Sequence, residues 1–589
     1  MTAVREWRWA GWAVVGIVIV VFAPTLALRM VRYDDHWLWS ESSPLRDLNT
    51  ATLRDLFFEL DARTRHPLGT EYLPVRDLFV AFDMWIWGTW EHGPHITQLV
   101  LYAASVYLLG SLLEAFGFDQ RVAWLGALLW AIHPLHVESV AWLSERKGIL
   151  SGLFVLACGH AWIRYRRGGR TWWLVIAAAC AVAGVWSKAP AMFAPLAYAT
   201  WDLLVLPRSR RRWIAICVVG GAAALAAVPV VLVARDARVI EETTAVNQPG
   251  RIASALGAQG HYVQRLVLAK PSSISHPIHT DGPSVVDIAV GLVALLGSAL
   301  VTVKWLRDVS HHALRLALLA WAWIWFVPVS HLLVRVHILV ADRFVYLWSL
   351  AACVGIAWLV IGLQRRVFRV AIAAALAGVL GIATIRAQSA WTSSVELFTH
   401  AFVINPRDPA VCENLAMSLR DDGRLEEAFV VLERGLSHHP KHPYLLKVKA
   451  AFLAARGQLD EAIQATALAA ESGKASAMWM HADLLHKARR DQEALPWAER
   501  AARRRPEIDG YAVTLSEILI ALGRHADAVP ILEDLVARAS AQPRYHLLLA
   551  TALIRAGRSE AARPHLDVAA RDPALAAAVA RLREQALRP

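Results

Sequence analysis

Hydrophobic residues are concentrated in the first 390 residues of the chain, where long runs of Leu, Val, Ala and Trp recur. A membrane helix needs about 20 apolar residues, and runs of this kind are too numerous here for the core of a water-soluble domain. We therefore predict an all-α, polytopic membrane domain over residues 1–390. The eleven predicted transmembrane helices lie near residues 8–28, 95–115, 122–137, 149–164, 171–188, 190–206, 213–234, 286–305, 313–331, 341–362 and 369–387.

A different pattern begins at Trp391. Similar six-residue segments, the first of them Gly423-Arg-Leu-Glu-Glu-Ala428, end in alanines spaced 34, 32, 34 and 34 residues apart, and the third segment has Arg489 in place of its Gly. A 34-residue period with a small residue where two helices cross is the signature of tetratricopeptide repeats. We predict about five or six such repeats over residues 391–589, forming a solenoid that binds an acceptor protein or peptide. The alternative is a helical array that only supports the chain or mediates oligomerisation.

The net charge of +12 does not indicate a nucleic-acid partner, because Arg residues cluster at the ends of the hydrophobic segments, where membrane topology requires them. Four of the five cysteines lie inside apolar runs and no Cys-x-x-Cys spacing occurs. Neither a disulfide framework nor a zinc site is therefore predicted.

The Arg clusters also predict the topology. Those at 164–170, 208–212 and 365–369 fall on one side of the membrane if the N-terminus is cytoplasmic, and Arg5 and Arg8 agree. We expect the first apolar run to be an anchor and the repeat domain to lie outside. Arg- and Ala-rich residue usage favours a bacterial inner membrane, which would make the repeats periplasmic.

Two long segments then face outward, at residues 29–94 and 234–285. In the first, Leu53–Leu60 and Leu73–Trp87 have helical patterning with interspersed charges, so we expect amphipathic helices along the membrane lipid. The middle of the second could form a short re-entrant helix.

Unusual polar residues of the membrane domain all fall near the outer face in this topology. Because the topology was derived from the Arg clusters alone, their convergence is independent support for a functional site. They are Asp34, Asp35, His133, His136, Glu138, Glu145, Arg146, Lys147, Lys188, His276, His279, His331, Arg343 and Tyr346.

These residue types suit the transfer of a sugar from a lipid phosphate. Cations such as Arg146, Lys147 and Arg343 would stabilise the phosphate leaving group. Asp34 or Asp35 would accept the proton of the acceptor hydroxyl, since adjacent carboxylates at a membrane rim raise one another's pKa. A direct displacement would invert the sugar configuration.

Each feature also has a structural interpretation. The adjacent acids could cap the next helix. His133, His136 and Glu138 could hold a divalent metal or simply pack at a helix end, and we disfavour the metal because no third His is near in sequence. Lys188 could extend to the membrane surface, and Arg343 could pair with its neighbour. No cofactor is expected.

Three segments resemble a known family. They read His133-Pro-Leu-His-Val-Glu-Ser-Val-Ala-Trp-Leu-Ser-Glu-Arg-Lys147, Ala341-Asp-Arg-Phe-Val-Tyr-Leu347 and Trp391-Thr-Ser-Ser-Val-Glu-Leu-Phe-Thr-His-Ala401, the last running into the repeats. This order is similar to that of the transmembrane-and-tetratricopeptide-repeat O-mannosyltransferases, which are glycosyltransferases of the GT-C superfamily.

The resemblance implies an inverting transfer from a polyprenyl-phosphate sugar, mannose in the eukaryotic relatives, to Ser or Thr hydroxyls. It implies that Asp34 is the base, with Asp35 beside it. Contacts to the donor phosphate and active site would carry over to Glu138, Arg146, Lys147, Arg343 and Tyr346. Lys188 departs from the family pattern, because it is followed by Ala189-Pro190 where relatives commonly have Lys-Pro.

Two other functions are open, of which the second gives the polar residues no role. A related transferase could modify a lipid or glycan instead of a protein. A non-enzymatic membrane scaffold could use only the repeats. A transporter is disfavoured because the charges lie at one rim and not at the bilayer midplane.

Overall fold

The computed structural model describes residues 8–40, 43–236, 250–269, 273–276, 282–332, 338–538 and 542–586. Every regular element within these ranges is a helix, as predicted. The chain divides into two compact units, Met1–Val411 and Cys412–Pro589. The first unit continues past the predicted domain boundary at residue 390, because η9 (Ser389–Trp391) and α21 (Ser394–Ile404) belong to it.

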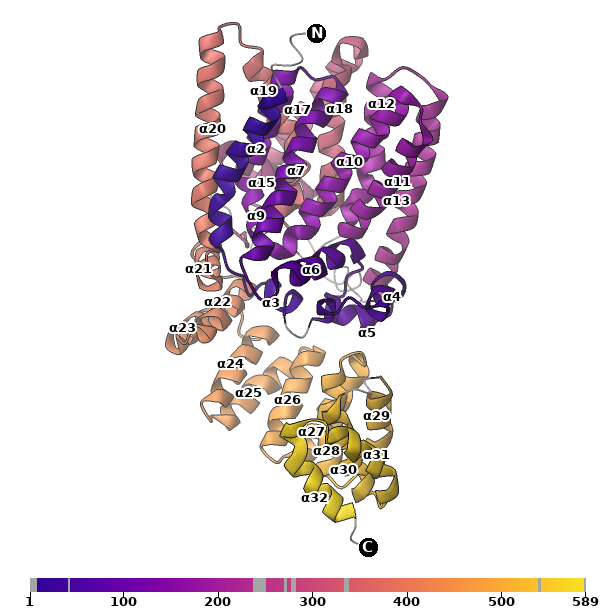
Figure 1. Cartoon of the computed structure of the whole chain (residues 1–589). Helices are drawn as coiled ribbons and strands as arrows, with labels where there is room; N and C mark the ends of the chain where they lie inside the picture. Colours follow the sequence, from indigo (N-terminus) through magenta and orange to yellow (C-terminus); the bar gives the residue numbers. More distant parts are fainter. Residues whose placement is uncertain are drawn as a thin grey trace. The chain divides into compact units, whose positions relative to one another are not determined.

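A helical bundle forms the body of the first unit (Figure 1). Each of the eleven predicted segments contains a helix of this bundle. In chain order they are α2 (Arg8–Phe22), α7 (Gly93–Phe116), α8 (Gln120–Ala131), α10 (Arg146–Gly168), α11 (Thr171–Ser187), α12 (Ala194–Val205), α13 (Arg210–Asp236), α17 (Val285–Leu306), α18 (Val309–Phe326), α19 (Ser349–Ile361) and α20 (Arg366–Gln388).

The prediction of eleven membrane-spanning helices is supported for only seven segments. Among the described residues, those that are long and apolar enough are Trp9–Ala27, Gly93–Phe116, Leu143–Gly168, Arg210–Arg235, Val285–Leu306, His312–Val329 and Arg366–Trp391. Helices α8, α11, α12 and α19 are shorter. Proline explains two of these cases, since α8 ends just before His133-Pro134 and α12 follows the 3-10 turn η6 (Ala189–Phe193), which contains Pro190.

The predicted outer loop, residues 29–94, folds into short helices at the end of the bundle opposite the N-terminus (Figure 1). They are α3 (Asp35–Leu38), α4 (Thr50–Phe58), α5 (Ala62–Arg65) and α6 (Pro74–Trp87), with the turns η2 (Pro44–Arg46) and η3 (His66–Leu68) between them. Helices α4 and α6 fall in the two stretches with predicted helical patterning. The buried face of α6 carries Arg76, Asp77 and Asp83, whereas Phe82 and Trp85 are exposed. The charges of this helix are therefore directed into the protein.

The predicted re-entrant segment contains a full helix, α15 (Arg251–Leu268), which packs against α17. Two glycines let the backbones approach closely. A Cβ added at Gly260 would lie 1.8 Å from the carbonyl oxygen of Asp287, and one added at Gly291 would lie 1.9 Å from that of Leu256. Packing through small residues is typical of helices within membranes.

Paired antiparallel helices make up the second unit. After α22 (Pro409–Asp421), which crosses the division, come α23 (Leu425–His438), α24 (Pro443–Ala455), α25 (Leu459–Ala470), α26 (Ala475–Lys487), α27 (Asp491–Arg504), α28 (Asp509–Ala521), α29 (His525–Arg538), α30 (Pro543–Arg555), α31 (Ser559–Ala569) and α32 (Ala576–Ala586). All five periodic alanines are completely buried: Ala428, Ala462, Ala494, Ala528 and Ala562. This burial is the reason for the repeat pattern seen in the sequence.

Candidate active site

Asp35 is a buried carboxylate that joins two distant parts of the chain. Its Oδ1 accepts hydrogen bonds from the backbone N–H and the hydroxyl of Ser144, at 2.9 and 2.7 Å, and its Oδ2 accepts one from the N–H of Val31 at 3.3 Å. Burial raises the pKa of Asp35 to about 6, although these donors act in the opposite direction. Oδ1 thus holds α3 against residues 143–145, and Oδ2 ties α3 to the segment that precedes it.

Asp34, by contrast, is exposed and caps the N-terminus of α3 with a left-handed backbone (φ +143°). Such a conformation is rare for a residue other than Gly and often marks a functional site. The Trp37 indole donates to Oδ1 at 3.3 Å. Neighbouring protein groups displace part of the water around the carboxylate and raise its pKa, while the charges of Lys147 and Arg343 lower it.

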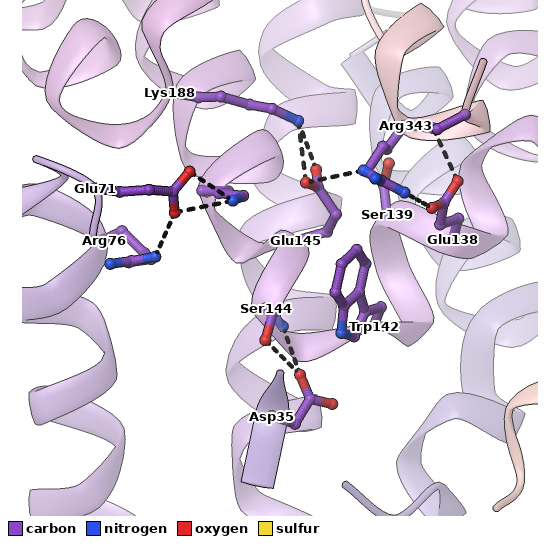
Figure 2. Close-up of polar contacts among 12 residues, drawn as sticks. Asp35, Glu71, Arg76, Glu138, Ser139, Trp142, Ser144, Glu145, Lys188 and Arg343 are labelled. Carbon is purple, nitrogen blue, oxygen red and sulfur yellow. Dashed lines mark hydrogen bonds and ion pairs between the residues drawn. The ribbon is translucent and has the colours of Figure 1, made fainter. Parts of the chain in front are cut away.

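Figure 2 shows a chain of alternating charges that includes Glu145, the residue after Ser144. Lys188 contacts both carboxylate oxygens of Glu145, at 3.1 and 2.7 Å, and Oε1 of Glu145 also lies 3.8 Å from Nε of Arg343. Arg343 also forms an ion pair with Glu138, which in addition accepts the Arg343 backbone N–H at 3.0 Å. The guanidinium is 5.2 Å from the centre of the Trp142 ring.

Glu71 also belongs to this network, although sequence reasoning missed it. Both of its oxygens accept from Lys147 Nζ, at 3.0 and 3.1 Å, and Oε2 lies 3.0 Å from Arg76 (Figure 2). Burial would raise the pKa of Glu71, but the charges of Lys147 and Arg76 lower it overall. The first outer loop and the start of α10 are thus joined by an ion pair.

Arg146 does not reach the cluster that contains Lys147. Its guanidinium is completely buried, where it pairs with Asp83, donates to Gln98 Oε1 at 3.0 Å and donates to the Pro94 carbonyl at 2.6 Å. These partners come from α6 and α7. We interpret Arg146 as a clamp between helices and not as a phosphate contact.

The two predicted histidines of the His-Pro-x-His segment serve packing. His133 Nε2 lies 3.0 Å from the Leu266 carbonyl, and its Nδ1 accepts the Leu135 N–H at 3.2 Å. His136 lies against the rings of Trp130 and Tyr346. In the described part of the chain, no three His, Cys, Asp or Glu side chains are grouped so that they could hold a metal ion.

The remaining predicted residues that the structure describes lie elsewhere in the first unit. His276 Nε2 is 3.6 Å from Asp342, which also pairs at 2.6 Å with Arg265, a second residue that the sequence did not reveal. His331 Nε2 is 2.7 Å from the Leu339 carbonyl. Tyr346 packs over Gly152, where a Cβ would come within 2.6 Å of the ring. His279 lies outside the described residues.

The arrangement can therefore do two things chemically. Asp34 offers an exposed carboxylate with a raised pKa, which suits a general base. Lys147 and Lys188, with side chains 21% and 20% exposed, offer cations that an anionic ligand could reach. The charges of Glu71, Lys147 and Arg343 all act on the Asp34 carboxylate.

Comparison with known proteins gives partial matches. A tetratricopeptide-repeat family model matches residues 419–484. The chain is 34% identical over 123 residues to Protein O-mannosyl-transferase Tmtc1 and 31% identical over 121 residues to Tmtc2, both from Drosophila melanogaster. Each match covers 20% of this chain, but only 14% of Tmtc1 and 13% of Tmtc2.

Among solved structures, YrrB, described as a TPR protein with an unusual peptide-binding site, is 19% identical, with a TM-score of 0.29. That match covers 32% of this chain and 99% of YrrB. Tetratricopeptide repeats generally bind proteins or peptides. Together with the apolar helices, the sequence matches support a membrane-associated protein related to the Tmtc O-mannosyl-transferases over one fifth of its length.

Proposed function

We propose that this chain is an inverting GT-C-type glycosyltransferase that moves a sugar from a polyprenyl-phosphate donor to a Ser or Thr hydroxyl of a protein. The observation that carries the proposal is the exposed Asp34 carboxylate within electrostatic reach of Lys147 and Arg343. The partial similarity to O-mannosyl-transferases supports a hydroxyl acceptor and a hexose as the transferred sugar.

In the proposed reaction, Asp34 accepts the proton of the acceptor hydroxyl while that oxygen attacks C1 of the sugar. The bond between C1 and the phosphate oxygen breaks, and its electron pair leaves with the lipid phosphate. Attack from the face opposite the leaving group inverts the configuration at C1. A carboxylate with a raised pKa is better matched to this proton transfer near neutral pH than an ordinary Asp.

The leaving phosphate gains negative charge as the bond breaks. Lys147 and Lys188 are the partly exposed cations of the cluster, and we assign them to this charge. Arg343 is held by Glu138 and by the Trp142 ring, so it contributes a fixed positive potential behind them. Asp35 positions the base by fixing α3 to Ser144.

The two units have different proposed tasks. The cluster draws Glu71 from the outer loop and Lys147 from the start of α10, and the helices of that loop lie at one end of the apolar bundle (Figure 1). This position suits a lipid-linked donor whose phosphate stays at the membrane surface. The repeats would bind the acceptor protein or peptide. We place this face of the membrane outside the cytoplasm, in the periplasm of a bacterial cell, on the basis of the Arg clusters at the other end of the helices.

The proposal is tested by mass spectrometry of cell-surface proteins with and without this chain. It predicts a hexose-sized addition on Ser or Thr that appears only when the chain is present. If surface proteins are unchanged but a lipid or glycan gains the sugar, the proposed acceptor is wrong. If nothing gains a sugar, the proposed transfer is wrong.

A further inference from the structure

Glu71 occupies Lys147, the most accessible cation of the site. Its two oxygens contact Lys147 Nζ at 3.0 and 3.1 Å, and one of them contacts Arg76 at 3.0 Å (Figure 2). Lys188 also acts electrostatically on this carboxylate. A phosphate group is bound in the same way, with several cations contacting its oxygens.

Arg76, Lys147 and Glu71 differ in how firmly their side chains are held. Arg76 is 3% exposed and is fixed by Asp77 at 2.7 Å and by the Leu68 carbonyl at 2.9 Å. The side chains of Lys147 and Glu71 are 21% and 43% exposed. Since exposed ion pairs contribute little to stability, the contact between Lys147 and Glu71 can be exchanged at low cost.

The backbone around Glu71 would permit such an exchange. Glu71 follows the left-handed residues Gly69 (φ +81°) and Thr70 (φ +57°) and precedes α6, so it belongs to neither a helix nor a strand. Its side chain can swing away from Lys147 without unwinding any helix. The residue is also close enough to the proposed base for its charge to raise the pKa of Asp34.

We propose that Glu71 is an internal stand-in for the donor phosphate. Before the donor binds, its carboxylate holds Lys147 in place and neutralises it. The lipid phosphate then takes over Lys147, and Glu71 moves aside. The donor phosphate is a diester with one charge, as the carboxylate has, and it gains a second charge when its bond to C1 breaks. The resulting monoester, which farnesyl phosphate also carries, has more charge and more acceptor oxygens than a carboxylate and therefore wins the competition for Lys147. The inference rests on the proposed function only in naming the donor, and it makes Glu71 a positioning residue.

The test measures binding of farnesyl phosphate to the full-length protein in detergent, without any sugar transfer. Glu71→Gln removes the competing charge but keeps the shape of the side chain. We expect affinity to rise by about two- to fivefold, the range that corresponds to loss of one partly exposed ion pair. Glu71→Asp, whose shorter side chain holds Lys147 less well, should tighten binding by a smaller factor.

Three controls identify the cause of a change. Glu59→Gln alters another carboxylate of the outer loop, at the end of α4, that pairs only with Arg54 among the described ion pairs, and it should have no effect. In a Lys147→Gln background, Glu71→Gln should no longer tighten binding. Inorganic phosphate should bind more weakly than farnesyl phosphate, but its affinity should also rise in Glu71→Gln. The affinity for farnesol should not change in Glu71→Gln.

The proposal is overturned if Glu71→Gln and Glu71→Asp both leave affinity unchanged or weaken it. It is also overturned if Glu71→Gln still raises the affinity in the Lys147→Gln background, or if the affinity for farnesol rises as much as the affinity for farnesyl phosphate. If Glu71→Gln fails to fold, Glu71→Asp alone decides between tighter and unchanged binding. Because no sugar is transferred in this assay, failure of the proposed enzyme activity would not mimic any of these results.

Discussion

Asp34 and Asp35 are neighbours in the chain, but their carboxylates meet different surroundings. The side chain of Asp35 is inside the protein and accepts three hydrogen bonds, while Asp34 faces solvent in a strained backbone conformation. The sequence left open which acid is the base. Exposure favours Asp34, because an acceptor hydroxyl has to reach the carboxylate that takes its proton.

The buried acid makes stability depend on pH. The pKa of Asp35 is raised from 3.8 to about 6 in the folded protein, so the folded state keeps this proton to a higher pH than the unfolded state. Its contribution to stability should therefore fall by about 3 kcal/mol as pH rises from 4 through 6. Asp35→Asn keeps an oxygen for Ser144 but cannot ionise. The difference in melting temperature, wild type minus variant, should decrease over that pH range, and a constant difference would contradict the assignment.

Arg146 is a second residue whose role the structure redefines. Arg146→Met would leave Asp83 buried without its partner, which should cost about 3–5 kcal/mol. The double variant Arg146→Met/Asp83→Leu should recover most of this loss, because it removes both charges. Denaturation of the detergent-solubilised protein measures the free energy of unfolding of both variants. If Arg146→Met instead kept full stability and lost donor binding, Arg146 would be a phosphate contact after all.

One position in the turn of each repeat has a left-handed backbone. The turns within four repeats contain Gly423, Gly457, Gly523 and Gly557, each with φ between +75° and +80°. The remaining repeat has Arg489 at φ +60°, and its turn closes with the same hydrogen bond, from Arg490 N–H to the Leu485 carbonyl. A side chain in this conformation is strained, whereas Gly is not.

Arg489→Gly should therefore stabilise the repeat unit by about 0.5–1 kcal/mol, the strain relieved minus the extra flexibility of Gly in the unfolded chain. Gly523→Arg, the reverse change in a neighbouring repeat, should destabilise the protein. Denaturant titrations followed by circular dichroism compare the two. If both variants changed stability equally and in the same direction, the turn conformation would not be the cause of the change in stability.

The helices were predictable because their signals are local. Hydrophobic runs and the 34-residue period depend only on neighbouring residues, and each predicted segment contains a helix. The number of membrane spans was not predictable in the same way. Short 3-10 turns, such as the one containing Pro190, take residues away from helices that the hydrophobic runs suggested were longer.

The candidate site was predictable only in part. Glu138, Glu145, Lys147, Lys188 and Arg343 meet as expected. Glu71 was missed because it lies in an irregular segment, 76 positions from Lys147, where no periodicity points to it. Conversely, His136 and Tyr346 looked like polar site residues, yet their rings pack against each other in the core.

At the scale of the whole molecule, we assign donor chemistry and acceptor binding to different units. The charged cluster and the apolar helices belong to Met1–Val411, and the repeats belong to Cys412–Pro589. A chain that ends at Val411 should keep its affinity for farnesyl phosphate to within about twofold but lose transfer to protein acceptors. Both activities are measured on the same detergent preparation, with phosphate-lipid binding as the check on folding. Undiminished transfer to protein would show that the repeats do not select the acceptor.

The central claim is that Asp34 is the base of a sugar transfer. Its most direct test is transfer from a polyprenyl-phosphate hexose to a Ser- and Thr-containing protein by purified wild type, Asp34→Asn and Asp35→Asn, each checked for a normal melting profile. Loss of a general base lowers rates by about 100- to 10,000-fold, and we expect this loss for Asp34→Asn, while Asp35→Asn retains most activity. Full activity in folded Asp34→Asn would contradict the account.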